Sequence, residues 1–143
     1  MAASQKLQAL YANYADKDYD TLCQEAEKRL ALVRPLLAEK VGDAQASTFL
    51  LYLVGILVGA DGRLSQNELA FIGRLLDENI SRQKMESLAH QVSTPSYQAT
   101  VDKIIDGFAP VLKHNLLMFC LCFLAVDASI DKREATYFEK LIQ

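Results

Sequence analysis

The feature that most constrains the fold of this chain is a pattern that occurs twice: an apolar run, a short turn and an amphipathic run. The apolar runs are residues 49–60 and 116–126, and each ends just before an aspartate, Asp61 in the first copy and Asp127 in the second. The offset that places Asp61 on Asp127 aligns further pairs of similar residues: Glu68 with Glu134, Leu64 with Ile130, Leu75 with Leu141 and Leu76 with Ile142. We therefore expect two copies of one helix-turn-helix unit to form the core.

Both apolar runs are predicted to be buried helices. Each is rich in leucine and is followed by a helix-capping signal, and neither alternates as a half-buried strand does. Both are shorter than the about 20 residues that cross a bilayer, so no membrane span is expected. Amphipathic stripes with three- and four-residue spacing fill most of the remaining chain. The prediction is an all-α, single-domain helical bundle of seven or eight helices with two pseudo-repeated units.

Capping residues predict where several helices begin. Ser65 followed by Glu68 matches the capping box, in which each side chain bonds the backbone N–H of the other residue. Asp131 followed by Glu134 repeats this spacing in the second unit. The other predicted caps are Ser81, Thr94 with Pro95 at the first helical position, and Gly42 as a C-terminal cap.

The first part of the chain is expected to add helices to this core. Residues 4–14 show an amphipathic stripe, and Asp20 is the predicted cap of a second helix. Pro35 lies within that helix and predicts a kink or break near Val33, because proline lacks the N–H that a helix interior needs. We therefore divide the chain into an N-terminal helical extension packed on the core, 1–43, and a helical domain, 44–143, with repeats at about 49–79 and 115–143.

Two glycines predict a close helix contact. Gly55 and Gly59 are four residues apart on one side of the first apolar helix, where the missing side chains let another helix approach. The second apolar helix is the expected partner, with Leu121 and Ala125 at the equivalent positions.

The composition of the chain narrows the range of functions and the cellular location to be expected. The net charge of −3 and the pI of about 5.3 argue against nucleic-acid binding, which needs a basic face. The three cysteines are an odd number, and two lie in an apolar run, which is typical of reduced, buried thiols in a cytoplasmic protein. Gln, Lys and Ser residues within 1–10 stand where a signal peptide would be apolar, so a cytoplasmic location is expected.

The two turns resemble a motif of the TerB-like family, to which tellurite-resistance TerB proteins and the N-terminal domain of a membrane-anchored J-domain co-chaperone belong. The motif is an apolar helix, Ala-Asp-Gly, a variable residue, Ile or Leu, Ser or Asp, two variable residues and Glu. Residues 60–68 match it. Residues 126–134 match at the acids and at Ile130, with Ala128 where the family usually has glycine. The resemblance covers about 44–143.

This resemblance implies an all-helical domain in which the two apolar helices pack together. Members of the family are regarded as non-enzymatic modules linked to metal-related stress, phage defence and assemblies on the cytoplasmic membrane surface. We therefore expect a non-enzymatic TerB-like protein-interaction module, linked to metal or tellurite stress or to membrane-surface assemblies. Its protein partner is unidentified. A homodimer and a peripheral membrane association through a partner are both compatible with it, and no cofactor is expected.

The alternative function is a divalent-metal-binding sensor. Acidic residues of the two turns have been suggested as metal ligands in the family, which here implies the set Asp61, Glu68, Asp127, Asp131 and Glu134. The residues themselves also support another interpretation, which we favour: the acids cap helices and bond backbone donors of their own turns. An EF-hand calcium loop starting at Leu57 does not fit, because Leu57 and Gly59 would occupy ligand positions one and three and offer no carboxylate.

Catalytic machinery is not apparent in the sequence. His90 and His114 are isolated and are expected at the surface. Cys120 and Cys122 are two apart and point in nearly opposite directions on a helix, so they do not form a Cys-x-x-Cys pair. No glycine-rich phosphate loop or nucleophile elbow is present.

Overall fold

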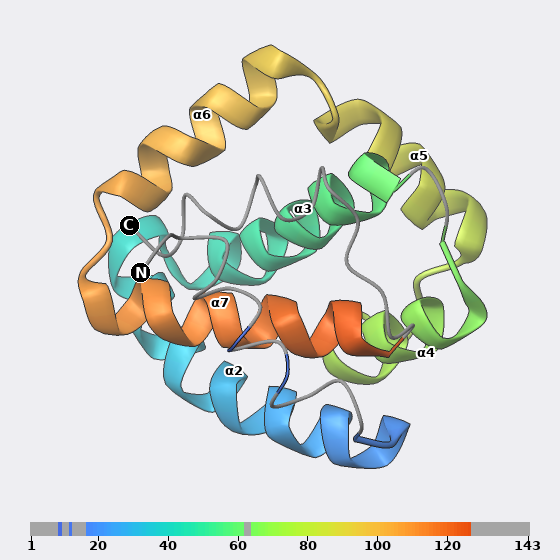
Figure 1. The fold of residues 1–143 in the computed structure, drawn as a ribbon. Helices are drawn as coiled ribbons and strands as arrows, with labels where there is room; N and C mark the ends of the chain where they lie inside the picture. The colour runs from blue at the N-terminus through green and yellow to red at the C-terminus, as the bar shows by residue number, and fades with distance from the viewer. Residues whose placement is uncertain (1–8, 10–11, 13–16, 62–63, 127–143) are drawn as a thin grey trace.

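A computed structural model describes residues 9, 12, 17–61 and 64–126 of the protein, without the side chains of 59–61. In this part the protein is all-helical. Six helices lie in this part, and it contains no strand. They are labelled as in Figure 1: α2 (Tyr19–Val41), α3 (Asp43–Asp61), α4 (Gln66–Leu75), α5 (Arg82–Val92), α6 (Pro95–Asp106) and α7 (Pro110–Ala125). The predicted helix at 4–14 and the second repeat from Asp127 onward lie outside the described residues.

Helices α2 and α7 form the most extensive helix pair and run antiparallel across the front of the bundle (Figure 1). Helix α3 runs above α7 in the view of Figure 1 and packs on α5 and α2. Helix α4 makes smaller contacts with α2 and α7. Between α2 and α3 the chain direction changes by 114° at Gly42, whose φ of 93° favours glycine. The Gly42 N–H bonds the carbonyl of Ala38, which confirms the predicted C-terminal cap.

Helix α2 differs from its prediction at two places. The N-cap is Asp18 rather than Asp20, and its Oδ1 accepts a hydrogen bond of 2.8 Å from the Thr21 N–H. The side chain of Thr21 and then its backbone N–H, by hydrogen bonding, lower the pKa of the Asp18 carboxyl below its ordinary value. Of the kink or break expected near Val33, the break does not occur, because α2 is one helix from Tyr19 to Val41. Ala31, whose carbonyl Pro35 cannot bond, is exposed, so water can replace the missing donor.

One apolar core joins the helices, and its aromatic rings link separate elements. Phe71 of α4 packs against Phe119 and Phe123 of α7, with ring centroids 5.8 and 5.6 Å apart. Phe49 of α3 meets Phe108, just before α7, at 5.9 Å. The apolar stripe of α2 belongs to the same core.

The predicted partner of Gly55 is wrong. A Cβ added at Gly55 would lie 3.1 Å from Cγ2 of Val92 and 3.7 Å from the Ala89 Cα, and both residues belong to α5. Helix α7 packs on α2 instead, so Gly55 does not face Leu121. The notch at Gly55 accommodates the β-branched Val92, which allows α3 and α5 to pack closely. The surroundings of Gly59 lie outside the described side chains.

The other helix limits follow local signals. Ser81 and Thr94 accept hydrogen bonds from the backbone N–H groups of Lys84 and Tyr97, which confirms both predicted caps. Helix α4 ends at Leu75, four residues before its predicted end near Asn79, and the Asp77 side chain bonds the Asn79 N–H in the turn that follows.

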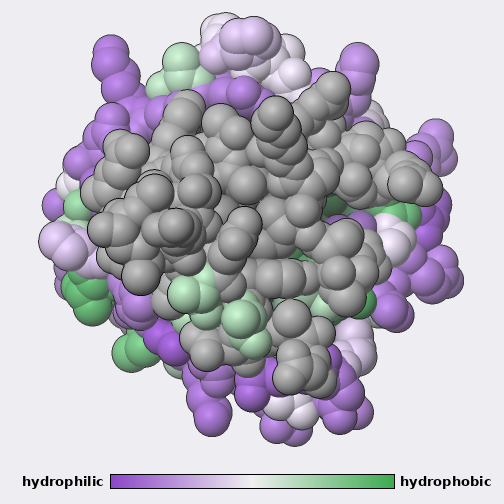
Figure 2. Space-filling view, viewed as in Figure 1, coloured by the Kyte–Doolittle hydropathy of each residue, from purple (hydrophilic) through white to green (hydrophobic). Residues whose placement is uncertain are grey.

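Polar side chains dominate the rim of the face that Figure 2 shows, with small apolar patches between them. Within the described part of the chain, no single helix is long and apolar enough to cross a membrane. The bent pair of α2 and α3, taken over 19–41 and 43–58, meets that test of length and composition only when its two helices are counted together.

Candidate functional site

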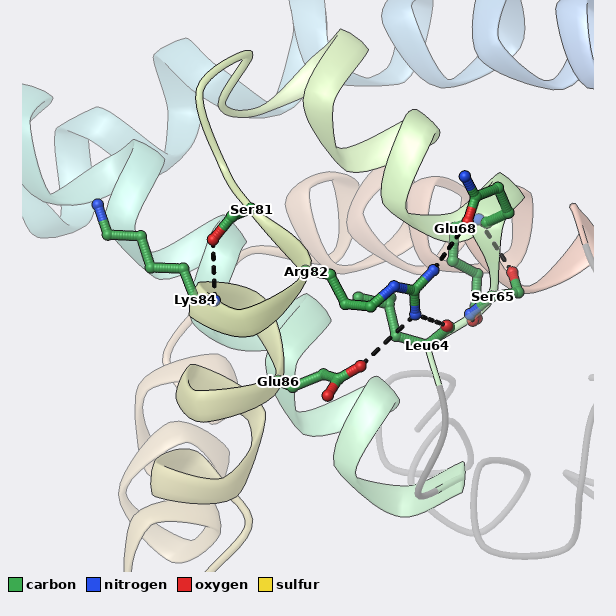
Figure 3. Close-up of polar contacts among 8 residues, drawn as sticks. Leu64, Ser65, Glu68, Ser81, Arg82, Lys84 and Glu86 are labelled. Carbon is green, nitrogen blue, oxygen red and sulfur yellow. Dashed lines mark hydrogen bonds and ion pairs between the residues drawn. The ribbon is translucent and has the colours of Figure 1, made fainter.

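The turn before α4 is organised by a capping box. Oγ of Ser65 accepts a hydrogen bond of 3.0 Å from the Glu68 N–H, and Oε1 of Glu68 accepts one of 2.8 Å from the Ser65 N–H (Figure 3). Glu68 is buried, and its carboxylate is committed to the helix start. The predicted capping box is therefore confirmed.

Arg82, at the first position of α5, ties this turn to the next helix. Its guanidinium donates to the Leu64 carbonyl and, over 3.0 Å, to Oε1 of Gln66, while Glu86 lies within ion-pair distance at 3.5 Å (Figure 3). These contacts satisfy a carbonyl of the turn and fix the approach of α5 to α4. The arrangement indicates a structural role for this turn.

The predicted metal ligands are not brought together in the described structure. Asp61 was predicted to begin the turn, but it is the last residue of α3, and its side chain is not described. Asp127, Asp131 and Glu134 lie outside the described residues. Among the residues that are described, no three His, Cys, Asp or Glu side chains gather closely enough to hold a metal ion. The metal site built from both turns stays a prediction.

The thiols and imidazoles take the positions that the sequence predicts. Cys23, Cys120 and Cys122 are all free and buried. Burial raises the pKa of Cys23 and of Cys120, and it raises the pKa of Cys122 to about 12. His90 and His114 are exposed on α5 and α7. A buried thiol that stays protonated is a poor nucleophile.

A hollow of about 320 Å³ between α2 and the end of α4 is the candidate binding site. Leu30, Ala31 and Leu75 supply its apolar lining, and Glu27, Arg34 and Arg74 supply its polar groups. On α2, Glu27, Ala31 and Arg34 follow the three- and four-residue spacing of one helix face. Arg74 and Leu75 are the last two residues of α4. The end of α4 against one face of α2 therefore creates the site.

Arg34 spans one end of the hollow. Its Nη2 donates to the Leu75 carbonyl over 3.0 Å, and its Nη1 donates to Oγ of Ser47 over 3.1 Å. The carbonyl at the end of α4 has no further turn of helix to bond, so the guanidinium supplies a donor there. These two bonds hold Arg34 between α2, α3 and α4.

Arg74 stands at the solvent side. Its Nη1 donates to Oδ1 of Asp20 over 3.1 Å, and its Nε lies 3.4 Å from Oε1 of Glu27. The bond to Asp20 is the main cause that raises the pKa of Arg74 above its ordinary value. The Arg74 side chain is 38% exposed and that of Glu27 is 51% exposed, so solvent and ligands can reach this pair. Such exposed ion pairs exchange partners at little cost.

The hollow combines an apolar floor with two guanidinium groups. Guanidinium groups bind carboxylates and phosphates in paired hydrogen bonds, and an apolar floor accepts an aliphatic side chain. The hollow contains neither thiol nor imidazole. Its polar lining consists of one carboxylate, from Glu27, and the two guanidinium groups.

Sequence reasoning missed this site. One available signal was the run of charged residues Asp20, Glu27 and Arg34 at seven-residue spacing beside the apolar stripe of α2. That spacing indicates one face of the helix, but it does not predict that Arg74 of α4 lies against this face. The juxtaposition depends on how α2 and α4 cross.

No family model, curated protein or solved structure matches this chain. The likeness to the TerB-like family rests on the turn motifs alone.

Proposed function

We propose that this chain is a non-enzymatic protein-interaction module that binds a partner protein through the hollow between α2 and α4. The observation that carries the proposal is the pair of arginines, Arg34 and Arg74, above an apolar floor of Leu30, Ala31 and Leu75. A hollow of about 320 Å³ accommodates one or two side chains of a partner. Cavities of this kind, with few polar groups around an apolar base, are typical of ligand and peptide recognition.

The character of the remaining reactive groups supports a non-enzymatic role. The buried thiols are protonated at neutral pH, and the exposed histidines lie on α5 and α7, away from the hollow lining. The TerB-like repeat, with seven or eight helices in the full bundle, belongs to the same proposal. It would place the module among proteins linked to metal-related stress or to membrane-surface assemblies.

Site-specific crosslinking in the source cells tests the proposal. A photoreactive benzoylphenylalanine at Ala31 stands in the hollow, and the same group at Glu39 stands at an exposed position of α2 outside it. We expect a discrete adduct with one protein from position 31, competed by unlabelled protein, and none from position 39. Adducts of equal yield at both positions, or none at position 31, would contradict the proposal.

A further inference from the structure

We propose, on the basis of the function above, that the hollow binds an acidic peptide segment in which an Asp or Glu side chain lies beside an aliphatic residue. The carboxylate would bond Arg34 and Arg74, and the aliphatic side chain would rest on Leu30, Ala31 and Leu75. Three features of the hollow support this ligand: the N–H donors of the two arginines, the apolar floor, and the carboxylate of Glu27, which already lies beside Arg74.

Both guanidinium groups keep donors for a ligand. A guanidinium has five N–H donors. Among the described residues, the bonds of Arg34 engage one N–H of Nη1 and one of Nη2, and those of Arg74 engage Nη1 and Nε. Arg34 therefore retains its Nε–H and Arg74 its Nη2 as further donors toward a carboxylate. Arg34 is held by its two bonds, so it presents these donors without reorganising.

Glu27 occupies the place that a ligand carboxylate would take. Its Oε1 lies 3.4 Å from Nε of Arg74, and half of its side chain is exposed. A peptide carboxylate would therefore replace the exposed Glu27–Arg74 ion pair by another ion pair with Arg74. The aliphatic side chain next to it in the peptide would at the same time move from water onto the apolar floor. The apolar contact supplies the net gain, and the carboxylate supplies selectivity.

One residue that lines the hollow, Ala31, has a backbone carbonyl without its usual helical donor. Pro35 has no N–H, so the Ala31 carbonyl lacks the donor that it would have four residues on. Ala31 is exposed and lines the hollow. A backbone N–H of an extended peptide, which neither a phosphate ion nor a free fatty acid has, can bond this carbonyl. This feature favours a peptide as the occupant.

Selection of peptides by the purified full-length chain tests the inference. A phage library displays random linear peptides without a free C-terminus, so that any enriched carboxylate is a side chain. We expect enrichment of Asp or Glu next to Leu, Ile or Val. The enriched peptide and its Glu→Gln or Asp→Asn counterpart are then labelled with fluorescein and titrated by fluorescence anisotropy. The amide counterpart should bind about tenfold more weakly or worse.

Four variants locate the binding. Arg34→Gln and Arg74→Gln should each weaken the acidic peptide about tenfold and leave the amide peptide nearly unchanged. Lys28→Gln is the matched control, because it removes the same charge from an exposed position of α2 outside the hollow, and it should bind as the parent does. Glu27→Gln should tighten binding about two- to fivefold, since it removes the competing carboxylate. A gain of affinity cannot arise from misfolding.

The outcomes separate this inference from the proposed function. Peptides that bind in the hollow with no acidic preference, and equally well to Arg34→Gln and Arg74→Gln, would overturn the inference and leave the interaction module standing. Selected peptides whose affinity is unchanged by Glu27→Gln would also count against it. A crosslinking result without an adduct at position 31 would overturn the proposed function itself.

Discussion

Arg34 of α2 donates a hydrogen bond from Nη2 to the carbonyl oxygen of Leu75, the last residue of α4, over 3.0 Å. The same guanidinium reaches Ser47 of α3 from Nη1. A single side chain thus joins three helices at the edge of the hollow. It fixes the end of α4, and with it the position of Arg74, relative to α2.

The first prediction concerns the stability that Arg34 provides. Arg34→Met keeps the aliphatic stem and removes both hydrogen bonds, so we expect the free energy of unfolding to fall by about 1–2 kcal/mol. Urea denaturation measures the change. Lys28→Met is the control, since Lys28 is exposed and makes neither bond. Equal stability of the two variants would show that the bonds of Arg34 do not hold α4.

The second prediction concerns a buried amide between α2 and α7. Asn115 is only 5% exposed; its Oδ1 accepts a 2.8 Å bond from Nη1 of Arg29, and its Nδ2 donates to the Val111 carbonyl. Asn115→Ala leaves the guanidinium without this acceptor and should cost about 1–3 kcal/mol of unfolding free energy.

A double variant separates the cost of the unpaired group from the value of the bond. In Arg29→Met with Asn115→Leu, both polar partners become apolar, and thermal unfolding should show a loss smaller than that of Asn115→Ala alone. A double variant that is less stable than Asn115→Ala would contradict this account of the α2–α7 interface.

The third prediction concerns Gly55 and Val92. Gly55→Leu should lower the free energy of unfolding by about 1–3 kcal/mol, because the added side chain meets Val92 of α5. Combining Gly55→Ala with Val92→Ala should lose less than Val92→Ala alone, since the new methyl group fills part of the space. Thermal unfolding measures all three variants. Unchanged stability of Gly55→Leu would show that α3 and α5 do not pack closely there.

The fourth prediction concerns the pH dependence of stability. Thiols of an unfolded chain lose their protons near pH about 8.5. Burial raises the pKa of Cys122 to about 12, so the folded protein keeps this proton where the unfolded chain loses it. The contribution of Cys122 to stability is therefore complete below about pH 8.5 and is lost as the pH rises from there toward 12.

Urea denaturation between pH 7 and pH 10 checks this sign. Cys122→Ala should be less stable than the parent at pH 7, and its stability should fall less steeply above about pH 8.5. Parallel pH profiles for the two proteins would show that the Cys122 thiol titrates alike in the folded and unfolded chains.

Local features of the fold were predictable because a few neighbouring residues determine them. The capping bonds of Ser65, Ser81 and Thr94 join each side chain to a backbone N–H three residues on, so their spacing in the sequence predicts them. The all-helical class followed from apolar periodicity in the same way. Asp18 and Asp20 lie within one helical turn of each other, and the sequence alone did not distinguish which of them caps α2.

Features that depend on helix crossings were not predictable. Gly55 indicates that a neighbour comes close, but α5 rather than α7 fills the notch. Pro35 indicates a lost backbone bond, but the exposure of Ala31 lets α2 continue. The hollow itself needs Arg74 beside α2, which no local pattern encodes.

The most direct test of the central claim, that a partner binds in the hollow between α2 and α4, is a map of chemical shift changes. Backbone and arginine Nε–H resonances of the ¹⁵N-labelled protein are recorded while the selected acidic peptide is added. We predict that the largest shifts occur at Leu30, Ala31, Arg34, Arg74 and Leu75, and that the amide counterpart of the peptide leaves the Arg34 and Arg74 Nε–H signals nearly unmoved. Largest shifts on α5 and α6, with the resonances of the hollow unchanged, would contradict the account.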